Sequence, residues 1–213
     1  MNRRGFVIAM LGAESTGKTT LCGELGSLLR SEGRDAVVVG EYLREFCDRH
    51  ARTPRRDEQA AIAAEQTRRI DEAAAQHAVV IADTTALMIA VYSDQVFDDT
   101  SLYRAAEQAQ RGCTATLLTA LDLAWQADGH QRDGPHVREP VDAKVRAALR
   151  RAGVAYSVVG GVGPARLAAA LSCVERALDP PRPDPGAPSC HSVCARCGEA
   201  DCERHLLPGR VLR

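Results

Sequence analysis

Residues 12–19 are Gly12-Ala13-Glu14-Ser15-Thr16-Gly17-Lys18-Thr19, a match to the pattern G-x-x-x-x-G-K-[ST]. The match lies between an apolar, strand-like run, Phe6–Leu11, and a segment with helical spacing, Thr19–Leu29. A strand before the pattern and a helix after it are the context in which this loop holds phosphate groups. Glycines let the backbone amides face phosphate oxygens, and the helix N-terminus adds partial positive charge. The stretch therefore predicts a P-loop nucleotide-binding protein.

The motif also predicts a role for its individual residues. Lys18 is expected to reach the β- and γ-phosphates, and Thr19 to offer its hydroxyl to Mg²⁺. The expected cofactor is therefore ATP with Mg²⁺. The residues expected to hold the nucleotide are Gly12, Glu14, Ser15, Thr16, Gly17, Lys18, Thr19 and Thr20.

Apolar runs rich in β-branched residues alternate with helical patterns along the chain. Strands are expected at Phe6–Leu11, Ala36–Val39, Val79–Ala82, Ala115–Thr119 and Ala155–Val159. Helices are expected at Thr19–Leu29, after Glu41 to about His50, at Asp57–Ala75, near 84–92 and 100–111, at Ala143–Arg151 and at Pro164–Leu178. This alternation predicts an α/β fold, a P-loop kinase-like three-layer sandwich with a five-stranded parallel sheet.

Composition divides the chain into three parts. Residues 1–178 carry the strand and helix patterns and form the predicted ATP-binding domain. Residues 179–189 are rich in proline and predict a semi-rigid linker. Residues 190–213 hold four of the eight cysteines and form a short predicted metal-binding tail.

Bulk properties exclude several classes of protein. The 213 residues carry a formal net charge of −1, so overall charge gives no reason to expect binding to nucleic acid or to an anionic membrane. No apolar run approaches the roughly 20 residues that span a bilayer. The basic start, Met1–Gly5, is followed by a run too short for a signal peptide. We therefore expect a cytoplasmic protein without a membrane partner.

Two carboxylates follow neighbouring predicted strands. Asp83 ends the strand that begins at Val79, which is the usual position of a metal-orienting aspartate opposite the phosphate loop. Glu41 follows the strand that begins at Ala36, where a carboxylate can accept the proton of an attacking hydroxyl or hold an acceptor's hydroxyls. The alternative for Glu41 is that it only caps the next helix.

The polar segment from Ala127 to Glu139 has the composition of a lid. Gly129 and Gly134 supply conformational freedom, and Arg132 and Arg138 are expected to fold onto the transferring phosphoryl group. An ordinary solvated loop is the alternative.

The tail contains two close pairs of candidate metal ligands. Cys194, Cys197, Cys202 and His205 have the spacing C-x₂-C-x₄-C-x₂-H, which suits tetrahedral Zn²⁺. Four protein ligands leave no open position, so such a zinc would be structural. The alternatives are a redox-active cysteine cluster and a chance arrangement, and the tail is also a candidate surface for a protein partner.

Several stretches together resemble a known family. They are the loop already quoted with Thr20-Leu21, then Glu41-Tyr42-Leu43-Arg44-Glu45-Phe46, Ala82-Asp83-Thr84 and Trp125-Gln126-Ala127-Asp128-Gly129. In this order they resemble the ribosylnicotinamide kinase domain of the bacterial NadR family of P-loop ATPases, over roughly residues 5 to 178. The family often has Asp-Thr-Asp where this chain has Asp83-Thr84-Thr85. The adenylyltransferase motif of the bifunctional members is not found here.

The resemblance implies a kinase that transfers the γ-phosphate of ATP to the 5′-hydroxyl of nicotinamide riboside or a related nucleoside. Glu41, Tyr42, Arg44 and Asp83 would then line the acceptor site. The rival hypothesis is a regulatory module in which bound ATP or GTP controls docking of a partner. The missing second acid after Asp83 is the observation that motivates this rival.

Overall fold

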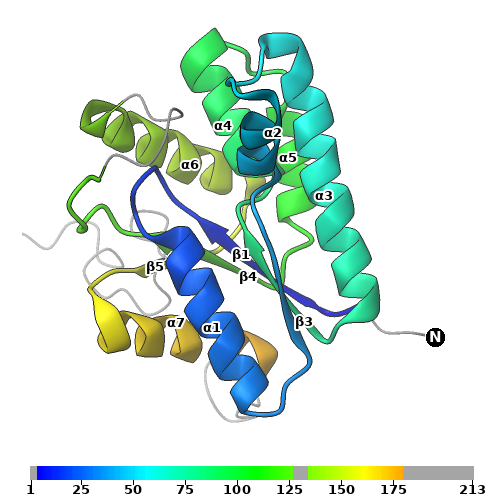
Figure 1. The fold of residues 1–213 in the computed structure, drawn as a ribbon, viewed down its shortest axis with the longest axis vertical. Helices are drawn as coiled ribbons and strands as arrows, with labels where there is room; N and C mark the ends of the chain where they lie inside the picture. Colours follow the sequence, from blue (N-terminus) through cyan, green and yellow to red (C-terminus); the bar gives the residue numbers. More distant parts are fainter. Residues whose placement is uncertain (1–3, 127–133, 180–213) are drawn as a thin grey trace, which may run out of the picture.

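A parallel sheet forms the centre of the molecule. The computed structural model describes residues 4–126 and 134–179. The strands are β1 (Phe6–Leu11), β2 (Ala36–Val39), β3 (Val79–Asp83), β4 (Ala115–Thr119) and β5 (Ser157–Val159). Within these ranges all pairings are parallel, in the order β2-β3-β1-β4-β5 (Figure 1). The prediction of a five-stranded parallel sheet is confirmed.

Helices connect the strands. They are α1 (Lys18–Ser31), α2 (Tyr42–His50), α3 (Gln59–Gln76), α4 (Ala86–Phe97), α5 (Tyr103–Gln110), α6 (Arg138–Ala152) and α7 (Gly163–Leu178). Short 3-10 turns at Arg56–Glu58 and Pro135–Val137 precede α3 and α6. Among the described residues, no helix is both long enough and apolar enough to cross a bilayer.

The helices form a layer on each face of the sheet. Helices α1 and α7 lie together on one face, and α3, α4, α5 and α6 lie on the other (Figure 1). Alternate strand residues serve the two layers, so Ile8 and Met10 pack toward α1 while Val7 packs toward α3. The first six residues of α4 are all buried because α3, α5 and α6 surround that helix. This packing explains why its sequence is apolar on every side.

Strand register brings three loops to one edge of the sheet. In the β1–β3 pair Met10 lies opposite Asp83, and in the β2–β3 pair Val39 lies opposite Ala82. The carboxyl ends of β1, β2 and β3 are therefore level with one another. Parallel sheets of this class bind ligands at this edge.

One predicted helix starts earlier than expected. Helix α6 begins at Arg138 and not at Ala143, so the polar segment before it is shorter than predicted. The 3-10 turn at Pro135–Val137 leads directly into α6, and Pro140 lies in its first turn. Proline is tolerated there because the first-turn amides have no partner within the helix. The predicted start of this helix at Ala143 was therefore wrong.

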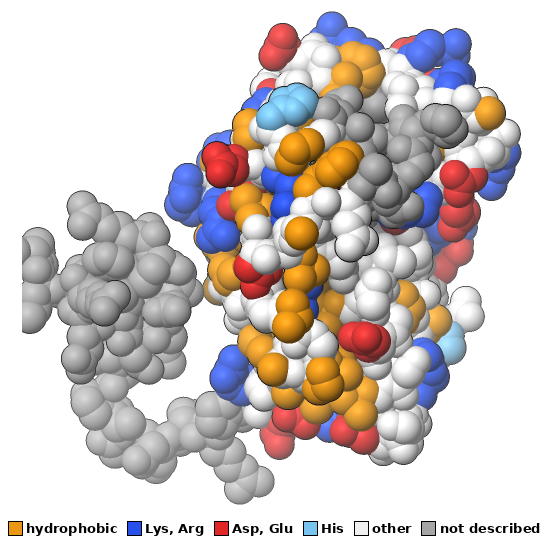
Figure 2. Space-filling view, turned by 60° about the vertical axis from the view of Figure 1, so that its left-hand side comes forward, with side chains coloured by type: hydrophobic (Ala, Val, Ile, Leu, Met, Phe, Trp, Pro, Cys, Tyr) orange, Lys and Arg blue, Asp and Glu red, His pale blue; other side chains and the backbone are white. Residues whose placement is uncertain are grey.

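The face nearest α7 is partly apolar. Figure 2 shows hydrophobic side chains gathered over the lower part of this face. Val158 in the edge strand β5 and Val162 just before α7 are exposed large apolar residues, at 47% and 68%. Strand β5 has only three residues, which limits how much unpaired backbone this edge presents.

Candidate functional site

The loop between β1 and α1 has the backbone conformations that a phosphate cradle needs. Gly17 is left-handed, with φ +72°, and so is Ser15, with φ +54°. A Cβ on Gly12 would lie 1.9 Å from the Thr119 hydroxyl oxygen, so only glycine fits this close approach. The left-handed turn at Gly17 leads straight into the first turn of α1.

Hydrogen bonds hold the loop from inside. The Thr16 hydroxyl, fully buried, donates to the Ala13 carbonyl at 2.8 Å. Thr119, at the end of β4, donates to the Thr16 hydroxyl oxygen at 2.7 Å. Lys18 Nζ donates to the same Ala13 carbonyl at 2.8 Å, so its ammonium lies over the loop. Two strands and the start of α1 therefore fix the loop.

The amide end of α1 is open to an anion. Its N-cap residue, Gly17, provides no side-chain cap, and no acidic residue occupies the first turn of the helix. The partial positive charge of the helix is therefore not neutralised by its own side chains. Thr19 and Thr20 are exposed in this first turn. This is the chemistry that the motif predicts for phosphate binding.

A buried arginine of α7 contacts the backbone of the phosphate loop. Arg166 in α7 is 5% exposed and donates to the Thr16 carbonyl at 2.6 Å. Its Nη1 would lie 3.2 Å from a Cβ placed on Gly17. Burial lowers the pKa of Arg166, partly offset by the negative charges of Asp122 and Glu24. The cation adds to the positive potential of the loop.

Asp83 ends β3 beside the phosphate loop. Its side chain is 2% exposed, and Oδ1 has no hydrogen-bond partner among the described residues. Burial raises the pKa of the Cys22 thiol in α1 well above 9.0; Asp83 raises it further and Lys18 lowers it. The negative charge of Asp83 and the positive charge of Lys18 therefore both act on the buried Cys22 sulfur. A carboxylate and an ammonium lie at the same end of the sheet, as the sequence predicts.

Thr85 stands where the NadR family often has a second aspartate, and in this structure it has a structural role. Thr85 is the N-cap of α4, and its hydroxyl oxygen accepts from the Leu87 amide at 3.2 Å. The same hydroxyl donates to Gln110 Oε1 at 2.7 Å, and Gln110 Nε2 donates to Thr116 at 2.9 Å. An aspartate could cap the helix but, when ionised, could not donate to Gln110.

Glu41 follows β2 at the same edge as Asp83. It is the N-cap residue of α2, but its side chain makes no capping hydrogen bond. Its side chain is 15% exposed and forms a 3.7 Å ion pair with Arg44. Glu41 therefore makes no capping hydrogen bond, although its carboxylate lies at the N-terminus of α2, where a negative charge is favourable.

Tyr42 and its neighbours form a charged cluster next to Glu41. The Arg69 guanidinium in α3 lies 4.4 Å from the centre of the Tyr42 ring. Arg69 Nη1 donates to both carboxylate oxygens of Glu45, at 2.7 and 2.8 Å, and Arg69 Nε donates to Glu65 at 2.8 Å. One face of the Tyr42 ring is thus covered by a cation that two glutamates hold in place.

The segment after β4 lies against the phosphate loop. Ser15 and Gln126 exchange two hydrogen bonds, because the Gln126 amide donates to the Ser15 hydroxyl at 2.8 Å and that hydroxyl lies 3.2 Å from the Gln126 carbonyl. Arg138, 8% exposed, donates to the Leu123 carbonyl at 2.9 Å. Its Nε and Nη2 have no partner within the part of the chain that the structure describes. The root of the predicted lid is therefore tied to the loop.

Several predicted residues lie outside the described ranges. They are Gly129 and Arg132 of the predicted lid, the linker from residue 180 onward, and the four tail ligands Cys194, Cys197, Cys202 and His205. Within the described ranges, no group of three or more His, Cys, Asp or Glu residues is arranged to hold a metal ion. The zinc hypothesis therefore rests on the spacing of the tail residues alone.

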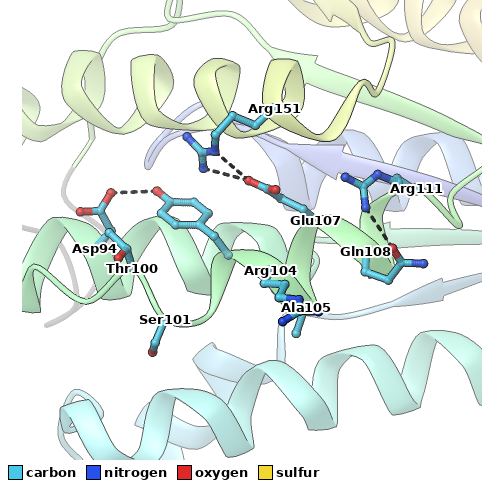
Figure 3. A pocket seen from close by; sticks show the side chains of 10 residues that line it. Asp94, Thr100, Ser101, Arg104, Ala105, Glu107, Gln108, Arg111 and Arg151 are labelled. Carbon is cyan, nitrogen blue, oxygen red and sulfur yellow. Dashed lines mark hydrogen bonds and ion pairs between the residues drawn. The ribbon is translucent and has the colours of Figure 1, made fainter.

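Two hollows lie away from the phosphate loop. The larger, about 1060 Å³, lies between α5 and α6 and is lined mainly by polar and charged side chains (Figure 3). Its groups pair with one another: Tyr103 donates to Asp94 at 2.9 Å and Arg151 donates to Glu107 at 3.0 Å. The smaller, about 350 Å³, is lined by residues of α3 and α5 among others. Neither is lined by a residue of the predicted site.

A family model of known proteins matches a range of this chain that includes both the sheet and the phosphate loop. Residues 7–166 match the model of a family described as AAA domain. The chain belongs to this family. No curated protein sequence gives a significant match.

Two solved structures share the fold of this AAA domain. A crystal structure of NadR protein in complex with NAD and AMP-PNP matches with a TM-score of 0.64 at 20% identity, over 81% of this chain and 49% of that one. A second, of NadR protein in complex with NR, matches with a TM-score of 0.65 at 19% identity, over 82% and 51%. The chain spans about half the length of these proteins. The NadR-like P-loop architecture is confirmed.

Three residues of the site were not predicted from the sequence. Arg166, Thr119 and Gln66 lie far along the chain from the residues they contact and belong to no motif. Thr119 carried a weak signal, as a polar residue at the end of a predicted strand. Arg166 and Gln66 resembled ordinary polar residues of surface helices.

Proposed function

We propose that this AAA domain is an ATP-dependent kinase that phosphorylates the hydroxyl of a ribosylated small molecule. Nicotinamide riboside is the first acceptor to test, because the sequence resembles ribosylnicotinamide kinases and a NadR structure holds NR. The observation that carries the proposal is that Glu41, just after β2, and Asp83, the last residue of β3, lie at the ends of adjacent strands, at the edge where the phosphate loop lies. A site that only holds a nucleotide and Mg²⁺ has no need for a carboxylate at Glu41.

The residues present fit a nucleotide with Mg²⁺. The open N-terminus of α1 and the glycine-lined loop suit the phosphates, and Lys18 supplies a cation for the β- and γ-phosphates. Asp83 offers a buried carboxylate oxygen that no described residue engages, and Thr19 offers an exposed hydroxyl. Mg²⁺ is commonly held by one or two protein groups together with phosphates and water. When bound, it would neutralise charge on the phosphates.

The acceptor would lie on the side of Glu41. That carboxylate is placed to accept the proton of the attacking hydroxyl, or to hold the acceptor's hydroxyls. Arg44 and Tyr42 would border the acceptor, with Arg44 also orienting Glu41 through their ion pair. Arg132 and Arg138 remain candidates for neutralising charge as the phosphoryl group is transferred. Most of the rate enhancement would come from this positioning and charge neutralisation.

An assay of ADP release across nicotinamide riboside and common nucleosides tests the proposal. We expect one acceptor to raise ADP release well above the rate with ATP alone. A folded preparation that binds ATP but shows no acceptor-dependent release would refute it. Slow hydrolysis that no acceptor changes would instead favour the nucleotide-dependent regulatory module.

We further propose that the tail, residues 190–213, holds a structural zinc and offers a surface to a protein partner. The support is the spacing of Cys194, Cys197, Cys202 and His205, with two ligands in each close pair. So short a segment has little apolar content for a core, so metal binding would supply its folding free energy. Residues 1–178 would then form the kinase domain and residues 179–189 the linker.

A further inference from the structure

Gln66 is a fully buried side chain in the middle of α3 that takes part in no sequence motif. Its amide oxygen accepts a hydrogen bond from the Tyr42 backbone amide at 2.8 Å. Its amide nitrogen donates to the Gly40 carbonyl at 3.2 Å and to the Thr84 carbonyl at 3.3 Å. One side chain therefore bonds to three backbone groups from two different loops.

These three groups flank the two carboxylates of the site. Gly40 and Tyr42 are the neighbours of Glu41 on either side, and Thr84 directly follows Asp83. A primary amide has two N–H donors and one oxygen, so it can serve all three groups at once. The opposite orientation of the amide would place its oxygen against two carbonyls. The contacts therefore fix how Gln66 is oriented, and they tie the end of β2 to the end of β3.

One of the bonded groups belongs to a strained residue. Thr84 has φ +80°, a conformation that β-branched residues rarely adopt. Such a backbone persists where its surroundings hold it from several sides. The Thr84 amide donates to the Met10 carbonyl at 3.1 Å, and Gln66 engages the Thr84 carbonyl. Strand β1 and helix α3 thus hold the backbone of Thr84, the residue that directly follows Asp83.

We propose that Gln66 is a positioning residue that sets the placement of Glu41 relative to Asp83. This inference rests on the proposed function, because the spacing of the two carboxylates matters only if the phosphate and the acceptor meet between them. Gln66 touches neither ligand and acts through the backbone on each side of Glu41 and after Asp83. Errors of about 1 Å in such placement can lower turnover by about 100-fold.

The test compares Gln66→Met with Gln59→Met, two nearly isosteric changes in one helix. Gln59 is also buried, at 5% exposure, but its Oε1 has no partner among the described residues. We expect Gln66→Met to lower kcat for acceptor phosphorylation by roughly 10- to 100-fold. Gln59→Met should leave kcat unchanged. Equal kcat in Gln66→Met and wild type would overturn the proposal.

A second variant covers the case in which Gln66→Met does not fold. Gln66→Glu keeps an acceptor for the Tyr42 amide but turns a carboxylate toward the Gly40 and Thr84 carbonyls. If Gln66 acts through these bonds, this variant should lose acceptor turnover as well. Wild-type kcat in a folded Gln66→Glu variant would contradict the role of the two carbonyl contacts.

Two further measurements separate this inference from the proposed function, because they need no acceptor. Hydrogen exchange at the Tyr42 amide should be faster in Gln66→Met than in wild type and Gln59→Met. The gain in AMP-PNP affinity on adding Mg²⁺ should also shrink in that variant, because Asp83 is displaced. If wild type phosphorylates no acceptor, the proposed function fails and these two results decide the inference. Unchanged exchange and an unchanged Mg²⁺ effect would overturn it.

Discussion

The Arg166 guanidinium donates a 2.6 Å hydrogen bond to the carbonyl oxygen of Thr16, 150 positions earlier in the chain. This bond joins the first turn of α7 to the phosphate loop. Because Arg166 is buried, its charge is screened less than that of a surface arginine. Helix α7 therefore belongs to the nucleotide site although it carries no part of the motif.

Replacing Arg166 should weaken nucleotide binding. In Arg166→Met the Thr16 carbonyl loses its partner, and an unsatisfied buried group costs about 1–3 kcal/mol. We expect the Kd for ATP, measured by calorimetry, to rise by about tenfold or more. The control is Arg176→Met, an exposed position on the same helix, which should leave the Kd unchanged. Equal affinity in both variants would show that Arg166 does not support the loop.

Two glycine-to-alanine changes should have opposite effects on stability. At Gly12 the new methyl group would lie 1.9 Å from the Thr119 hydroxyl oxygen, so we expect Gly12→Ala to destabilise the fold by about 1–3 kcal/mol. At Gly23, exposed on α1 with no atom within 4 Å, alanine should stabilise the helix by roughly 0.5–1 kcal/mol. Denaturant unfolding measures both. A stable Gly12→Ala variant with normal ATP binding would contradict the described loop geometry.

Acid should destabilise the ion pairs of α3. Hydrogen bonds from Arg68 and then Arg69 lower the pKa of Glu65 from 4.5 to about 2. Because the folded pKa is below the unfolded one, the unfolded chain binds more protons between these values. The stability that Glu65 contributes is thus present above pH 4.5 and is lost as the pH falls toward about 2.

The melting temperature as a function of pH checks this contribution. The difference between wild type and Glu65→Gln should be largest near neutral pH and should shrink below pH 4.5. The wild type measured over the same pH range is the reference for Glu65→Gln. A constant difference between wild type and Glu65→Gln across the acid range would rule out this account of the ion pairs.

Metal analysis tests the tail hypothesis. If the tail holds zinc, the purified chain should contain about one zinc per molecule. The double variant Cys194→Ala/Cys197→Ala loses two of four ligands and should contain far less. Residues 1–178 of this variant should still bind ATP, since the loop and α1 are untouched. Equal zinc content in the two proteins would refute the assignment.

The parts of the fold that were predicted from the sequence depend on local patterns. The motif at residues 12–19 follows a strand and leads into a helix as expected, and Asp83 and Glu41 lie at the carboxyl ends of adjacent strands. These features follow from hydrophobic periodicity and from the rule that parallel strands share a carboxyl edge. The start of α6 was not predicted correctly, because it depends on a 3-10 turn that hydrophobic periodicity does not reveal.

The contacts that support the site were not predictable in this way. Gln66 bonds to Tyr42, 24 positions away, and Arg166 bonds to Thr16 across most of the domain. A polar residue in an amphipathic helix has the same pattern whether it faces solvent or a buried loop. Only the packing of α3 and α7 against the strand ends distinguishes these cases.

The most direct test of the proposed function is to identify the phosphorylated product. The chain is incubated with ATP, Mg²⁺ and the acceptor that raises ADP release, and the acceptor is then analysed by mass spectrometry. We predict an acceptor that gains one phosphoryl group on its 5′-hydroxyl. Lys18→Met should abolish the product, and Glu41→Gln should lower its rate without weakening ATP binding. Free phosphate in place of a phosphorylated acceptor, at a rate equal in wild type and Glu41→Gln, would contradict the account.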